Sequence, residues 1–202
     1  MNIKKYGAVL ACMLILVALT TFSGCFSADG DGSIKTASTL MISVKESLSD
    51  IDWNNDHPGS IKAKLTGCQT NMNSAMDILN SIEISDEEQM QRVYAMKVMG
   101  QGYLDFISAG MDIADVIEHY NNAKDAANIY DFDKWDHEIM LANSAIDSAC
   151  NMLYIAGYRL DQVDPDKISI EMRGALSDMR TKTSYLNLIV DRLNTELKKA
   201  IA

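Results

Sequence analysis

The sequence contains very little proline and has no pattern typical of β-strands. Only two of its 202 residues are proline, Pro58 and Pro165. No segment alternates polar and apolar residues with the period of two that a half-buried strand requires. A chain with so few helix-breaking residues and no strand pattern is predicted to be all-α.

The sequence also lacks the motifs of several enzyme classes. It has no P-loop, no Gly-x-Ser-x-Gly and no His-Glu-x-x-His. It has no Glu-x-x-His either, which a di-iron bundle requires on facing helices. We therefore expect a protein that is not an enzyme and that needs no cofactor.

The charge of the chain is acidic. It has 18 basic and 28 acidic residues, which give a formal net charge of −10 at neutral pH. Such a surface repels phosphates, which argues against nucleic-acid binding and against electrostatic docking on anionic lipid. Any attachment to a membrane is therefore expected to come from a lipid on the protein itself.

The first residues have the layout of a secretory signal. Lys4 and Lys5 precede an uncharged run that extends to Gly24. The strongly apolar part, residues 8–19, is about as long as the apolar region of a signal peptide. It is short for a membrane span, which needs about 20 residues. The alternative interpretation is a plain signal anchor with an incidental cysteine at position 25.

Phe22, Ser23, Gly24 and Cys25 resemble a lipobox, the signal found in bacterial and archaeal membrane lipoproteins. The phenylalanine departs from the leucine that is more usual at that position. The resemblance implies that a signal peptide, residues 1–24, is removed and that Cys25 carries the lipid. It further implies a protein anchored in the cell membrane and facing outside the cytoplasm. The resemblance does not extend to the domain that follows.

Beyond the signal, the chain is expected to hold a tether and one helical domain. Residues 25–33 start at the lipidated cysteine and continue with small, acidic and glycine residues, as in a tether. Residues 34–202 are long enough for one buried core. Five stretches there carry apolar residues at alternating spacings of three and four, typical of amphipathic helices. These stretches begin near Ile34, Pro58, Ser85, Trp135 and Pro165.

The connections between these stretches are short, which makes successive helices antiparallel. Ser85 and Glu88 form a capping-box pattern that opens the third helix. Asp164 followed by Pro165 opens the fifth. The sequence therefore predicts an up-and-down bundle of about five helices, in which a short hairpin of the first two packs on three long helices.

Cys68 and Cys150 remain once the cysteines of the signal and the lipobox are set aside. Two cysteines outside the cytoplasm favour a disulfide. Counting residues along the predicted helices places them at nearly the same height. Because bridged Cα atoms lie within about 7 Å, the bridge predicts that the second helix packs directly on the fourth. The alternative is a pair of free thiols.

Histidine, tryptophan and acidic residues gather near the helix ends that lie away from the predicted anchor. Histidine and carboxylate beside aromatic rings suit a divalent metal or a cationic ligand. The alternative is that polar residues occupy these corners while the rings close the end of the bundle. The residues of this candidate ligand or metal site are His57, His137, Asp133, Asp136, Trp53 and Trp135.

We therefore expect a lipid-anchored helical bundle outside the cytoplasm that acts as a binding or protein-interaction module. A second hypothesis is a sensor or capture domain that takes a solute or metal at the corner away from the anchor. The residue patterns indicate neither the partner nor the oligomeric state.

Overall fold

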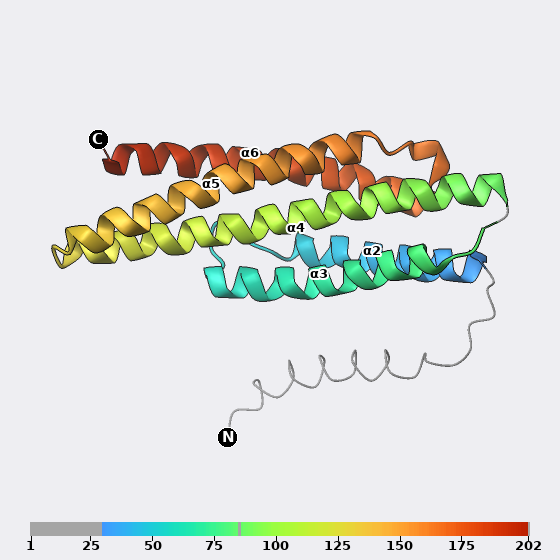
Figure 1. Ribbon diagram of the computed structural model, residues 1–202, viewed down its shortest axis with the longest axis horizontal. Coiled ribbons are helices and arrows are strands. Elements are labelled where there is room, and N and C mark those ends of the chain that lie inside the picture. The colour runs from blue at the N-terminus through green and yellow to red at the C-terminus, as the bar shows by residue number, and fades with distance from the viewer. Residues whose placement is uncertain (1–29, 85, 202) are drawn as a thin grey trace, which may run out of the picture.

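The computed structural model describes residues 30–84 and 86–201 (Figure 1). The predicted signal peptide, Cys25 and the first part of the predicted tether lie outside these residues. The described residues form five α-helices and one short 3₁₀ helix, without a strand. The prediction of an all-α protein is confirmed. The elements are α2 (Gly30–Ser49), α3 (Pro58–Ser81), α4 (Glu87–Asn128), α5 (Phe132–Asp161), η1 (Pro165–Lys167) and α6 (Ile170–Ile201).

The helices form an antiparallel bundle with two unequal parts. The hairpin of α2 and α3 has helices of 20 and 24 residues, whereas α4, α5 and α6 have 42, 30 and 32. Figure 1 shows the short hairpin lying along one half of the long α4, while α5 and α6 run along its other side. The predicted arrangement, a short hairpin on three long helices, is confirmed.

The apolar stripes of the sequence are buried where the helices meet. In α2 and α3 the buried side chains recur every three or four residues, as the sequence predicts. The central helix α4 differs because it packs against α3 and α5 and touches α2 and α6 as well. Its own residues Tyr103, Phe106 and Ile107 are all almost completely buried. Burial on several faces identifies α4 as the axis of the bundle.

Glycines on α4 mark the places where its partners come closest. A Cβ at Gly110 would lie 2.8 Å from Cη2 of Trp53 and 3.0 Å from Cδ1 of Leu65. A Cβ at Gly102 would lie 3.0 Å from Cδ2 of Leu160 on α5. The end of the α2–α3 hairpin therefore docks at Gly110, near the middle of α4.

Several helices begin at other residues than the sequence predicts; α5, for example, begins at Phe132 instead of near Trp135. The first helix starts at Gly30, so the last residues of the predicted tether are helical. The N-cap of α4 is Asp86, whose side chain accepts a hydrogen bond from the Gln89 amide at 2.8 Å. Ser85, the predicted cap, lies outside the described residues.

The entry into the last helix takes two steps. Asp164 is a cap, as predicted, but its side chain accepts from the Asp166 amide and closes the 3₁₀ turn η1. The α6 helix itself begins only at Ile170. Of the helices in the described ranges, none combines the length and the apolar character needed to cross a membrane.

Candidate interaction site

The predicted disulfide between Cys68 and Cys150 is wrong. Both cysteines are free, Cys68 buried on α3 and Cys150 exposed on α5. The reason is the position of α4, which packs against both α3 and α5 and so lies between the two helices. Similar heights along the bundle are therefore not sufficient for a bridge. Burial raises the pKa of the Cys68 thiol to about 11, so this thiol stays protonated at neutral pH.

The predicted ligand or metal site is not assembled. Within residues 30–84 and 86–200, no three His, Cys, Asp or Glu side chains are grouped so that they could hold a metal ion. Trp53 is buried against Gly110, and His57 caps α3 by accepting a hydrogen bond from the Gly59 amide at 3.2 Å. The other four members lie in the first two turns of α5: Asp133, Trp135, Asp136 and His137.

The members of that predicted site are separated because the two hairpins end at different levels. Trp53 belongs to the connection between α2 and α3, which reaches α4 at Gly110. The start of α5 lies beside the end of α4, where the Asp131 amide donates to the Ala126 carbonyl at 3.0 Å. Gly110 and Ala126 are 16 positions apart, which is roughly 24 Å along a helix. Trp53 therefore fits the alternative to a ligand site, in which aromatic rings close the core: its ring closes the core of the short hairpin.

A polar clamp joins α4 to α5 below their connection. Nδ1 of His119 lies 2.7 Å from Oε2 of Glu138, and the Asn122 side-chain amide donates to the same oxygen at 3.4 Å. The hydrogen bond from His119 lowers the pKa of the Glu138 carboxyl, and that from Asn122 adds to the effect. Because an ionised carboxylate only accepts, Nδ1 of His119 carries the proton in this bond. The clamp fixes the two long helices relative to each other.

A second set of polar contacts fixes the short hairpin. Nζ of Lys62 on α3 lies 2.6 Å from both the Asp115 and Glu118 carboxylates of α4. Asn54, in the connection between α2 and α3, contacts the Tyr185 hydroxyl at 3.2 Å and accepts from Arg192 at 2.8 Å. These contacts tie the hairpin to both α4 and α6.

Residues 129–131 connect α4 to α5 in a tight turn, and we call this turn together with Phe132, the first residue of α5, the hairpin tip. The Tyr130 amide donates to the Ala127 carbonyl at 3.1 Å, and the Asp131 amide donates to the Ala126 carbonyl at 3.0 Å. This pair of bonds is the Schellman motif that ends many helices. The Asp131 side chain then accepts from the Lys134 amide at 3.1 Å and caps α5. One helix therefore stops and the next begins within three residues.

Tyr130 occupies the position of the Schellman motif that usually holds glycine. Its φ is 60°. Among the described residues, no other residue apart from glycine has a positive φ. For an L-amino acid this left-handed conformation costs about 1–2 kcal/mol, because Cβ approaches the carbonyl oxygen. A glycine would avoid this cost.

The hairpin tip exposes three large apolar side chains. Ile129, Tyr130 and Phe132 are 69%, 81% and 63% exposed. In Figure 1 the α4–α5 hairpin projects past the end of α6, at the opposite end of the bundle from the start of α2. Large apolar side chains that are exposed together in one turn make the tip a candidate interaction site. The sequence gives no clear signal for the tip, because Ile129 lies three residues after Ala126 and Phe132 lies seven residues before Ile139, the spacings of the buried stripes of α4 and α5.

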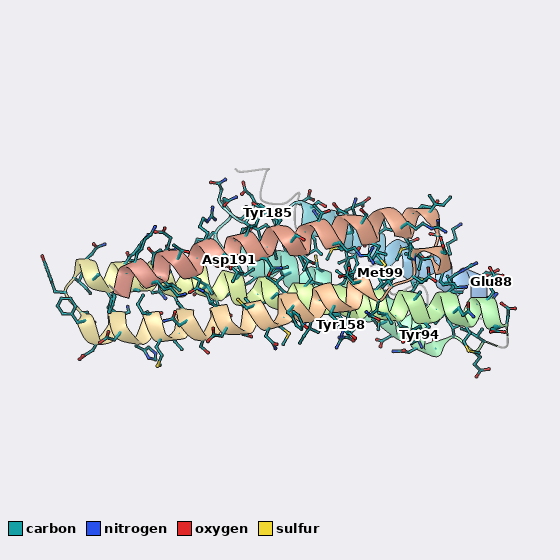
Figure 2. All side chains as sticks on the ribbon, turned by 90° about the horizontal axis from the view of Figure 1, so that it is seen from above. Glu88, Tyr94, Met99, Tyr158, Tyr185 and Asp191 are labelled. Carbon is teal, nitrogen blue, oxygen red and sulfur yellow. The ribbon has the colours of Figure 1, made fainter. Side chains whose placement is uncertain are left out.

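Two open hollows lie on the surface of the described part of the bundle. The larger, about 580 Å³, lies where α4 begins and is lined by charged side chains that include Glu88 and Arg92, 3.7 Å apart. The smaller, about 380 Å³, lies between α5 and α6 beside Tyr154 and Tyr158. Figure 2 places Glu88 at the end of the bundle opposite the hairpin tip and Tyr158 between the two ends. Neither hollow gathers groups that point to a reaction.

No protein-family model, curated protein or solved structure matches the chain. Its function must therefore be inferred from the geometry of the described residues.

Proposed function

We propose that the protein is a lipid-anchored interaction module that faces outside the cytoplasm. Lipid on Cys25 holds the chain in the cell membrane, and the helical bundle presents the hairpin tip to a protein partner. The bundle itself catalyses no reaction and carries no cofactor. Its task is to hold an apolar contact surface at a fixed distance from the membrane.

The observation that carries this proposal is the exposed apolar tip at the end of the bundle opposite the first described residue. The first described helix begins at Gly30, five positions after Cys25 in the sequence. The tip lies at the other end of α4, whose 42 residues span about 63 Å. A lipid-anchored chain with this geometry holds Ile129, Tyr130 and Phe132 far from the anchor.

The internal contacts of the bundle support a role as a rigid support. The His119–Glu138 clamp joins α4 to α5 a few turns from the tip. The Lys62 contacts with α4 fix the short hairpin against the same helix. A preorganised surface loses less conformational entropy when a partner binds, which favours affinity.

Lysine-specific cross-linking in intact cells tests the proposed interaction site. Lys124 and Lys134 are exposed near the tip, whereas Lys35 and Lys167 are exposed near the opposite end. We expect links to another protein to start from Lys124 or Lys134, as identified by mass spectrometry. Links that start mainly from Lys35 or Lys167 would contradict a partner at the tip.

The anchor is tested separately with Cys25→Ser. Without the thiol that takes the lipid, we expect the protein to leave the membrane fraction or to keep its signal peptide. An unmodified Cys25 in the mass of processed, membrane-bound wild-type protein would refute lipid anchoring. This outcome would leave the cross-linking result unaffected.

A further inference from the structure

The residue at the apex of the hairpin tip does not suit the backbone that holds it. Tyr130 has a φ of 60°, and its amide and that of Asp131 close the Schellman motif. Glycine is the usual residue at this position and asparagine the next most common. Tyrosine therefore strains the turn, and strained residues of this kind gather at functional sites.

No packing within the bundle compensates for this strain. The Tyr130 side chain is exposed, as are the flanking Ile129 and Phe132. A ring in solvent contributes nothing to the core, so glycine at position 130 would give a more stable protein. The tyrosine therefore has its use in a contact made outside this chain.

The charges around the tip indicate the chemistry of the partner. Residues 124–136 contain four acidic and two basic side chains, a formal charge of −2. One of the two cations, Lys124, lies over the Tyr120 ring, with Nζ 4.3 Å from the ring centre. The turn itself is thus acidic, and at the adjoining end of α6 the Lys199 ammonium pairs with the Glu196 carboxylate at 2.8 Å. Electrostatic complementarity favours a partner surface that carries lysine or arginine.

We infer that Tyr130 is the anchor residue of a docking contact, in which the hairpin tip enters an apolar pocket of a protein partner with a basic rim. This inference rests on the proposed function and adds the partner's chemistry to it. Aromatic residues that fill a pocket at the centre of an interface carry much of the binding energy. A second copy of this chain is disfavoured as the partner, since its net charge is −10. The acidic turn likewise disfavours an anionic bilayer.

The test measures stability and contact in the same full-length, membrane-bound protein. A photo-reactive benzoylphenylalanine replaces Phe132, and illumination of intact cells joins it to whatever touches the tip. We expect a discrete adduct with another polypeptide, whose linked residue lies beside lysine or arginine in an apolar pocket. Tyr130→Gly should lower the adduct yield at least about tenfold, the effect expected for a hot-spot residue. Glycine loses more chain entropy on folding, which leaves a net gain of about 1 kcal/mol, so the same change should raise the melting temperature by about 2–4 °C.

Three matched variants separate the ring, the charge and general exposure. Tyr130→Phe keeps the ring and should keep the adduct, whereas Asp133→Lys reverses one charge and should weaken it. Tyr94→Ala removes a tyrosine that is 70% exposed near the other end of α4 and should leave the adduct unchanged. Figure 2 shows Tyr94 on the same side of the molecule as Tyr158, away from the tip.

Several results would overturn the inference. They are an adduct unaffected by Tyr130→Gly, an adduct with lipid or with a second copy of the chain, and a melting temperature that falls in that variant. Cross-links from Lys124 or Lys134 that persist in Tyr130→Gly would reject Tyr130 as the anchor residue while leaving the proposed interaction module intact. Failure of those cross-links in the wild type would reject both.

Discussion

Replacing Gly110 with alanine tests whether the short hairpin docks on α4 as described. The new Cβ would lie 2.8 Å from Cη2 of Trp53 and 3.0 Å from Cδ1 of Leu65. Trp53 is buried, so its ring cannot withdraw into solvent. Overpacking of this kind costs about 1–3 kcal/mol. The helix propensity of alanine returns about 1 kcal/mol. We therefore expect Gly110→Ala to change the free energy of unfolding by between 0 and about −2 kcal/mol.

Gly67→Ala is the matched control for this change. Gly67 is exposed within α3, and a Cβ there would meet nothing within 4 Å. This variant gains the propensity of alanine without the collision, so it should be more stable than wild type by up to about 1 kcal/mol. Urea denaturation followed by circular dichroism measures both variants. The reasoning is refuted if Gly110→Ala stabilises the protein as much as Gly67→Ala does.

Three further predictions concern single side chains. Maleimide labelling of the native protein, mapped by mass spectrometry, should modify Cys150 and spare the buried Cys68 until the protein unfolds. If both cysteines are protected until a reductant is added, a disulfide joins them and this prediction is wrong. Burial raises the pKa of Asp112 above its ordinary value of 3.8, so the native state holds this proton to higher pH and loses stability as the pH rises above that value. Asp112→Asn should therefore be more stable than wild type at pH 7 and equally stable below pH 3.8, and a difference that does not vary with pH would count against this. Asp86→Ala removes the N-cap of α4 and should destabilise the protein by about 1 kcal/mol in the same urea assay, whereas an unchanged midpoint would show that the cap is dispensable.

Most of the fold could be predicted because its information is local. The alternating spacings of three and four define the buried faces of α2 and α3, and the short connections define antiparallel neighbours. The order in which helices pack is not local. Cys68 and Cys150 lie on helices with similar patterns, and nothing in either pattern says that α4 lies between them. The disulfide prediction failed for this reason.

The candidate site was missed for a different physical reason. Metal and ligand sites are sought as clusters of histidine and acidic residues, and such residues are frequent at any helix end. The predicted members near Trp53 and Trp135 are separated because one hairpin ends near the middle of α4. The positive φ of Tyr130 depends on how α4 stops, and its exposure depends on how far the other helices extend. Both facts require the assembled structure.

Energy transfer from the protein to a membrane tests the central claim most directly. The lipid-anchored protein, in a Cys150→Ser background, is placed in vesicles whose headgroups carry an acceptor dye. A donor dye is attached either to Glu88→Cys, at the start of α4, or to Phe132→Cys, at the hairpin tip. Since α4 spans about 63 Å, we expect strong transfer from position 88 and little from position 132.

The two donor positions make the result unambiguous. The buried Cys68 stays unlabelled, and an unlipidated protein made with Cys25→Ser should give little transfer from either position. Strong transfer from 88 and weak transfer from 132 is the result that a membrane-anchored bundle with a distal tip predicts. Equal and strong transfer from both positions would show that the bundle lies along the membrane, and would contradict the account.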